Sequence, residues 1–212
     1  MILAIDTSSE FASIALLMPD GSTREVLLNS SDGHAHKIFE QIHVLLERES
    51  TSLDQVTGFA AASGPGSFTG VRVALAAAKG FAEANRKPLL PVSNLEALAW
   101  HGQAPLRAPL IDARRGEIYG ALYDAALDPV LPETVGSLQS WLSTLPNDAI
   151  EFVATDFGPF GSVLKGPQRL APRGLATAIA HIAQARILAG RAQDPAAADA
   201  NYVRRSDAEL NF

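Results

Sequence analysis

Three short segments with the pattern of strands follow one another at the start of the chain before any helical pattern begins, and this order limits the fold more than any other feature. They lie at Ile2–Thr7, which is an apolar run, Phe11–Met18 and Thr23–Asn29, and the turn residues Pro19-Asp20-Gly21-Ser22 separate the second segment from the third. We expect each segment to form a strand. The chain therefore begins with a strand-rich meander.

Helices and strands then alternate. Helical patterns occur at His34–Glu49 and Ser67–Asn85, and short strands are expected at Thr57–Ser63 and Leu89–Val92. Ser93-Asn94-Leu95-Glu96 has the residues of a capping box that starts a third helix. The order strand-strand-strand-helix-strand-helix-strand-helix is typical of a ribonuclease-H-like α/β fold.

The second half of the chain again begins with paired strands. We expect them at Leu110–Ala113 and Glu117–Tyr123, after a Gly- and Pro-interrupted stretch at Gly102–Pro109. This predicts a first domain over residues 1–104 and a smaller second domain over residues 105–212, whose tail can pack back on the first. The expected architecture is a duplicated ribonuclease-H-like fold, of the actin, Hsp70 and sugar-kinase type, with a reduced second domain.

The remaining segments follow a less regular pattern. We expect, in order, a Pro-rich loop, a short helix, a strand, an Ala-rich helix and a polar tail, at Asp128–Gly136, Ser137–Leu145, Ile150–Thr155, Leu175–Ala192 and Asn201–Phe212. The chain has no low-complexity tract and no close sequence repeat.

Both long helices of the first half carry more apolar surface than one sheet face can cover. On a helical wheel Ile38, Ile42 and Leu45 form the core stripe of the first helix, and Phe39 lies to one side of that stripe. The second helix confines its charges to one narrow stripe, and a helix that is apolar nearly all round is buried on most sides. We therefore expect a further surface to cover both helices.

Composition excludes several classes of protein. The 17 Lys and Arg against 23 Asp and Glu give a net charge of −6, which argues against a free-standing nucleic-acid binder. Without cysteine there is no disulfide, thiolate metal site or Cys nucleophile. No apolar run is long enough to span a membrane, and the N-terminus lacks the features of a signal peptide. We expect a cytoplasmic protein with no membrane contact.

Asp6, Thr7 and Ser8 follow the first strand and are the weak candidates for cofactor binding. In a duplicated ribonuclease-H-like protein this loop meets nucleotide phosphates, and an Asp there can position a metal-bound water. The alternative is that the three residues close a turn through side-chain-to-backbone hydrogen bonds.

A second candidate is the Gly-rich turn from Ser63 to Gly70, between a strand and a helix. A helix N-terminus there could bind an anion. The spacing matches neither a Walker A loop, because no Lys follows the second Gly, nor the dinucleotide pattern, because Thr69 stands where its third Gly belongs. Alternatively, the glycines allow a sharp reversal with tight packing.

No catalytic or metal-binding residue can be assigned. His36, Glu40 and His43 share one helix ridge, but no Cys or second clustered carboxylate completes a metal shell. No Ser–His–Asp set or nucleophile elbow can be identified.

Two arginine pairs could contact phosphate. Arg114-Arg115 stands at a predicted hairpin tip and Arg204-Arg205 in the tail, which would make the chain a tRNA-binding module. Pairing with neighbouring acids, Asp112 and Glu117 for the first pair, is the alternative.

Several stretches in this order resemble the TsaB (YeaZ) family of bacterial tRNA threonylcarbamoyladenosine synthesis. They are Ile2–Ser8, Gly64–Arg72, Val92–Leu98, Asp112–Tyr119 and Asn201–Arg205. The resemblance covers residues 2–205, and its most specific motifs are GPGSFTG-x-R and DARRGE.

The resemblance implies a non-catalytic scaffold and activator. Its partner is TsaD, a paralogue that moves a threonylcarbamoyl group onto the adenosine beside the anticodon of tRNA. TsaE, an ATPase, joins a larger complex, and TsaC or its relative makes the threonylcarbamoyl-adenylate. It also implies a homodimer when the chain is alone, only indirect contact with tRNA, and ATP or ADP and metal on the partner subunits.

The residues themselves favour the non-catalytic role. TsaD-type enzymes carry a His-x-x-x-His metal motif in a stretch resembling Val92–Leu98, and here Asn94 and Leu98 occupy the two positions. Leu cannot ligate a metal and Asn is a poor substitute for imidazole. The alternative function is a nucleotide-dependent phosphotransferase or a metallopeptidase-like enzyme of the same superfamily.

The two long helices resemble those with which the family forms its homodimer and its TsaD heterodimer. Combined with the helical wheels, this places the partner interface at five side chains: His36, Phe39, His43, Val71 and Leu75.

Overall fold

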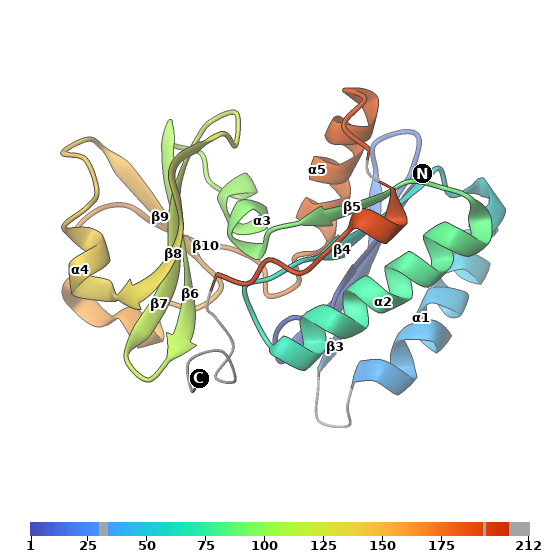
Figure 1. The fold of residues 1–212 in the computed structure, drawn as a ribbon, viewed down its shortest axis with the longest axis horizontal. Coiled ribbons are helices and arrows are strands. Elements are labelled where there is room, and N and C mark those ends of the chain that lie inside the picture. The colour runs from blue at the N-terminus through green and yellow to red at the C-terminus, as the bar shows by residue number, and fades with distance from the viewer. Residues whose placement is uncertain (30–33, 193, 204–212) are drawn as a thin grey trace. The chain divides into compact units, whose positions relative to one another are not determined.

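Two five-stranded sheets with the same strand order organise the chain in a computed structural model (Figure 1). The structure describes residues 1–29, 34–192 and 194–203, and of residues 34–36 and 161–162 it describes the backbone only. None of the helices in these ranges combines the length and apolar character needed to cross a membrane.

The first sheet has the order β3-β2-β1-β4-β5. Its strands are β1 (Ile2–Asp6), β2 (Phe11–Leu17), β3 (Thr23–Asn29), β4 (Gly58–Ala62) and β5 (Leu89–Val92). The first three pair antiparallel, and β4 and β5 continue the sheet in parallel with β1. The predicted meander is confirmed.

The second sheet repeats this plan in the order β8-β7-β6-β9-β10. Its strands are β6 (Leu106–Arg114), β7 (Glu117–Asp124), β8 (Pro129–Ser137), β9 (Ile150–Ala154) and β10 (Gln168–Leu170). Again three strands pair antiparallel and two extend the sheet in parallel. The duplicated ribonuclease-H-like fold predicted from the sequence is therefore present.

The second copy is reduced mainly in its helices. The first copy has the 15-residue α1 (His34–Arg48) and the 18-residue α2 (Phe68–Asn85). At the corresponding places the second has the 5-residue α4 (Leu138–Leu142) and the short 3-10 helix η3 (Gly158–Val163). The reduction predicted for the second half therefore consists of shorter helices at these two places.

The compact units differ from the predicted ranges. Among the described residues, one unit contains 1–93 and 174–200, and the other contains 94–173 and 201–203. The cause is an exchange of helices: α3 (Asn94–Trp100), which follows β5, packs on β6 and β7, whereas α5 (Ala176–Leu188), which follows β10, packs on β1, β2 and β4. Chain order alone does not reveal such an exchange.

Strand β1 is buried on both faces and lies at the centre of the first unit. Leu3 and Ile5 belong to a core cluster with apolar residues of α1 and α2, which lie along one face of the sheet (Figure 1). α5 covers the opposite face, where Ile2 and Ile187 both approach Gly58. Burial on both sides explains the continuous apolar run that begins the sequence.

The prediction of a loop at Asp128–Gly136 is wrong, because all but the first of these residues belong to strand β8. β8 is an edge strand, where a missing proline N–H costs no hydrogen bond to a further strand. Its pairing with β7 is irregular between Gly120 and Tyr123, opposite the stretch that contains Pro132. Proline content therefore indicated an edge rather than a loop.

A buried carboxylate connects β9 to the segment after α3. Glu151 accepts hydrogen bonds from the backbone N–H of Gln103 (2.6 Å) and Ala104 (3.1 Å) and from Nε of Arg169 (2.9 Å). Burial alone would raise the pKa of Glu151, but these donors outweigh burial and hold that pKa below its usual value of 4.5.

Replacing Glu151→Gln should therefore cost stability in a pH-dependent way. At pH 7 we expect a loss of about 1.5–3 kcal/mol, because charge-assisted hydrogen bonds are lost. A lowered pKa in the folded state contributes stability above pH 4.5, and this contribution is lost as pH falls through the folded pKa. The loss should shrink at about pH 3.5.

Urea unfolding followed by tryptophan fluorescence measures this effect, because Trp100 and Trp141 both belong to the second unit. An equal loss at both pH values would contradict the assigned role of the charge.

Candidate loop site and partner-binding surface

The loop after β1 is closed by its own side chains. Asp6, Thr7 and Ser8 are all at most 3% exposed. One carboxylate oxygen of Asp6 accepts hydrogen bonds from the backbone N–H (2.9 Å) and hydroxyl (2.5 Å) of Ser8, and the Thr7 hydroxyl donates to the Gly70 carbonyl (2.6 Å). The side-chain groups that could hold a phosphate thus already make hydrogen bonds within the turn or to α2.

The Gly-rich turn packs directly against this loop. The Ser67 N–H donates to the Ser8 carbonyl (2.7 Å). A Cβ atom at position 66 would lie 2.6 Å from the Ser8 carbonyl oxygen, and one at position 70 would lie 1.8 Å from the Thr7 carbonyl oxygen. The Ser67 hydroxyl accepts from the Gly70 N–H and caps α2. The glycines allow close backbone approach, which was the packing alternative for this motif.

The positions that resemble a TsaD-type metal motif are buried. Asn94 and Leu98 lie in α3 and are 2% and 1% exposed. Over the ranges that the structure describes, no three His, Asp or Glu side chains gather as a metal site would require.

The histidines with described side chains are dispersed. His43 is exposed and lies 3.3 Å from the Glu47 carboxylate, one turn further along α1. Burial lowers the pKa of both His101 and His181, which favours their neutral forms. The side chain of His36 lies outside the described residues.

Helix α1 exposes large apolar side chains. Phe39 is 55% exposed and Val44 is 46% exposed. The ring of Phe39 lies 5.7 Å from that of Phe81 on α2, which stacks on the buried ring of Phe59 at 5.9 Å. The predicted contact residue Phe39 is therefore a surface residue supported from the core.

Val71 and Leu75 lie elsewhere than expected. They are 5% and 6% exposed and belong to the core cluster beneath α1 and α2, so neither offers free surface in this chain. Because α2 is apolar nearly all round, its sequence pattern does not reveal which side of the helix packs on the sheet.

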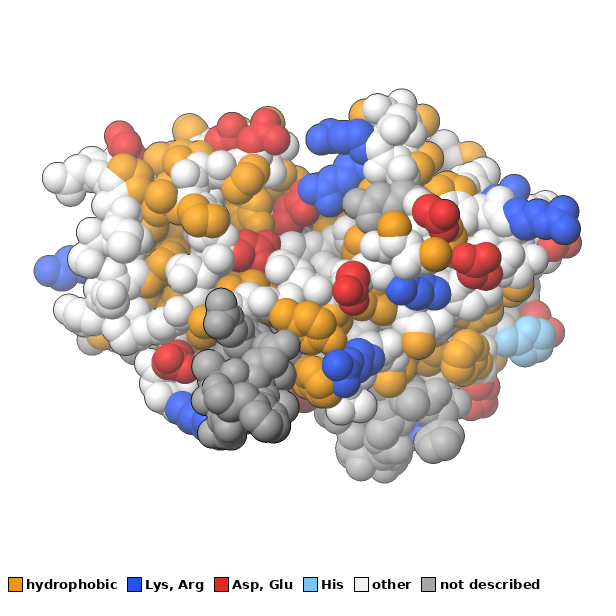
Figure 2. Space-filling view, in the orientation of Figure 1, with side chains coloured by type: hydrophobic (Ala, Val, Ile, Leu, Met, Phe, Trp, Pro, Cys, Tyr) orange, Lys and Arg blue, Asp and Glu red, His pale blue; other side chains and the backbone are white. Residues whose placement is uncertain are grey.

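The exposed side of α2 is instead a row of residues spaced by four. It consists of Phe68, Arg72, Ala76, Gly80 and Ala84, and the Arg72 guanidinium lies 3.5 Å from the centroid of the Phe68 ring. This spacing was available in the sequence and could have identified the row. Figure 2 shows hydrophobic side chains interspersed with charged ones over this helix.

The Arg114-Arg115 pair does stand at a hairpin tip. Both residues have positive φ, 65° and 56°. Asp112 accepts from the Arg114 backbone N–H (2.8 Å) and from its guanidinium (3.3 Å), so pairing with a neighbouring acid is present for Arg114. Arg204 and Arg205 lie outside the described residues.

Replacing Gly70→Ala should destabilise the first unit by at least about 3 kcal/mol, because the new methyl group collides with the backbone of Thr7. The matched control is Gly80→Ala in the same helix, where a Cβ meets nothing within 4 Å. That change should raise stability by about 0.4–1 kcal/mol. Urea unfolding followed by far-UV circular dichroism compares them, and equal stabilities would contradict the close approach.

Comparison with known proteins supports one family. The protein-family model described as "TsaD: tRNA N6-adenosine threonylcarbamoyltransferase" matches residues 28–205 of this chain. The tRNA threonylcarbamoyladenosine biosynthesis protein TsaB of Bacillus subtilis is 36% identical over 149 residues, which cover 68% of this chain and 65% of that protein. The Escherichia coli TsaB is 37% identical over 126 residues, 58% of this chain and 54% of that protein. The matches thus span less than two thirds of these relatives.

A solved structure gives the same result. A Pseudomonas aeruginosa protein, described as uncharacterized and similar to peptidase YeaZ, has a TM-score of 0.83 at 28% identity. The alignment covers 96% of this chain and 99% of that chain. The resemblance identified in the sequence is confirmed: the chain belongs to the TsaB (YeaZ) family.

Proposed function

We propose that this chain is a non-catalytic scaffold and activator in the formation of threonylcarbamoyladenosine beside the anticodon of tRNA, and that it acts by binding TsaD. The observation that carries the proposal is the uncovered apolar surface of α1 and α2. We call this surface the α1–α2 face, and its residues are Phe39 of α1 and Phe68, Ala76, Gly80 and Ala84 of α2. Membership of the TsaB family supports the pathway.

The α1–α2 face has the properties of a helix-packing surface. The small residues Ala76, Gly80 and Ala84 would let another helix approach α2 closely. Phe39 and Phe68 offer large apolar area at the edges, and aromatic side chains often dominate binding energy at interfaces. The Phe81 ring packs against the Phe39 ring and already restricts its motion. Binding a partner would therefore cost little further side-chain entropy at Phe39.

The closed loop after β1 supports a role without catalysis. The Asp6 carboxylate has a partner within the turn and the Thr7 hydroxyl has one in α2, and Leu98 cannot replace a metal-binding histidine. Tight binding of ATP by the isolated chain would instead favour the alternative, a nucleotide-dependent enzyme of the same superfamily.

The cofactors and remaining partners follow from this role. ATP or ADP and metal would reside on the partner subunits, and TsaE would join the larger complex. Without TsaD, the α1–α2 face would pair two copies of this chain. The net charge of −6 fits a subunit that leaves the tRNA phosphates to its partners.

Replacing Phe39→Asp should weaken the complex with TsaD at least about tenfold, because a charge would replace an aromatic contact in the apolar surface. The fold should persist, because Phe39 is 55% exposed. Isothermal titration calorimetry with purified TsaD measures the affinity, and circular dichroism checks the fold.

Leu188→Asp is the matched control. Leu188 is 82% exposed at the end of α5, outside the α1–α2 face, so this variant should bind TsaD as the wild type does. If Phe39→Asp also retained wild-type affinity, the α1–α2 face would not be the contact surface.

A further inference from the structure

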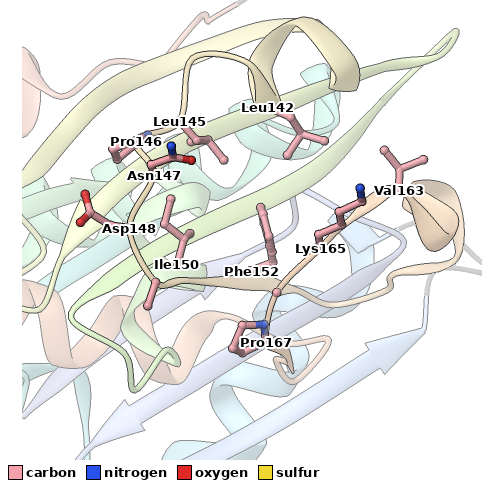
Figure 3. Close-up of a pocket in the computed structure, with 12 residues that line it drawn as sticks. Leu142, Leu145, Pro146, Asn147, Asp148, Ile150, Phe152, Val163, Lys165 and Pro167 are labelled. Atoms are coloured by element: carbon pink, nitrogen blue, oxygen red, sulfur yellow. The ribbon is translucent and has the colours of Figure 1, made fainter.

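A groove in the second unit belongs to none of the features used above (Figure 3). It has a volume of about 490 Å³ and lies among the end of α4, the loop after it, the start of β9 and the segment that follows η3. That volume lies within the range of the pockets in which proteins bind small ligands.

The floor of the groove is apolar. Ile150 and Phe152 of β9 form its buried part, at 7% and 4% exposure. Leu142 and Leu145 are half-buried along one side, and Val163 is left 44% exposed at the rim. A large apolar side chain placed here would remove this surface from water.

Opposite charges stand at the two ends. In Figure 3 Asp148 lies on one side of the apolar residues and Lys165 on the other. Both are exposed, and within the described part of the chain neither takes part in an ion pair or a side-chain hydrogen bond. Each charge is therefore available to a ligand.

The floor is held in place by its backbone and its neighbours. The Phe152 N–H donates to the Pro167 carbonyl (2.9 Å), and the Phe152 ring meets Trp141 edge-on at 6.5 Å. A Cβ at position 166 would lie 3.2 Å from the Ile150 carbonyl oxygen and 3.3 Å from the Phe152 ring. The groove is thus largely preformed, which lowers the cost of binding.

We propose that this groove binds a short extended peptide segment of another protein. An apolar side chain of the segment lies on the floor, with a basic residue at the Asp148 end and an acidic residue at the Lys165 end. This charge pattern argues against a nucleic acid, whose phosphates Asp148 would repel. The groove lies in the second unit and the α1–α2 face in the first, so the proposal stands whether or not that face binds TsaD.

Capped peptides with an apolar centre test the charge pattern. The probes are acetyl-Lys-Gly-Leu-Phe-Gly-Glu-amide and its two relatives with Lys at both ends or Glu at both ends. Because exposed ion pairs contribute modestly, the wild type should bind the Lys/Glu peptide at least about threefold more tightly than either relative.

Variants should change this preference in a defined way. Lys165→Glu should favour the peptide with two Lys, and Asp148→Lys the peptide with two Glu. The double variant Asp148→Lys with Lys165→Glu should prefer the Lys/Glu peptide again, since an extended peptide can bind in either direction. Val163→Asn, which changes no charge, should weaken all three at least about fivefold without unfolding the unit, because Val163 is half exposed.

Calorimetry measures the affinities, and backbone amide shifts in NMR spectra locate the binding. Perturbed amides near residues 145–152 and 163–167, with preferences that follow the charges, would support the proposal. Absence of binding by every peptide at about 1 mM, equal binding of all three, or shifts confined to other residues would overturn it.

Discussion

The carbonyl oxygen of Thr7 lies where a residue with any side chain at position 70 would collide with it. This close approach places the start of α2 against the loop after β1. A hydrogen bond from the Thr7 hydroxyl to the Gly70 carbonyl also joins the loop to the helix at this point. The position of α2 determines which of its sides packs on β1 and which remains exposed. The proposed partner surface and the closed loop thus depend on one close backbone approach.

Duplication explains the rest of the architecture. Each sheet has three antiparallel strands and two parallel ones, and the helix that follows the last strand of each sheet belongs to the other unit. The second copy lost most of its helical cover, and its short α4 and η3 border the groove between Asp148 and Lys165. The first copy kept long helices, and their outward sides form the α1–α2 face.

Periodicity and turn chemistry were sufficient to predict nearly every element of the first sheet and the duplicated plan. β1, β2 and β4 are mostly apolar runs between clear breaks, and β3 follows the turn at Pro19–Ser22. The order of motifs was sufficient to identify the family. Both depend on neighbours along the chain, which a sequence records directly.

The sequence was least informative where tertiary contacts decide. β8 has the composition of a loop because an edge strand tolerates proline. Val71 and Leu75 are apolar like their neighbours, and only packing against β1 distinguishes the buried side of α2 from the exposed side. The exchange of α3 and α5 between units leaves no local pattern, and the roles of Gly66 and Gly70 depend on distant backbone atoms.

The central claim is that this chain promotes transfer by binding and performs no transfer itself. The most direct test measures threonylcarbamoyladenosine formed on tRNA by TsaD and TsaE, supplied with ATP and threonylcarbamoyl-adenylate, with and without this chain. The account predicts that modification depends on the chain and that the chain alone modifies no tRNA. Modification by the chain alone, or an unchanged rate when it is omitted, would contradict the account.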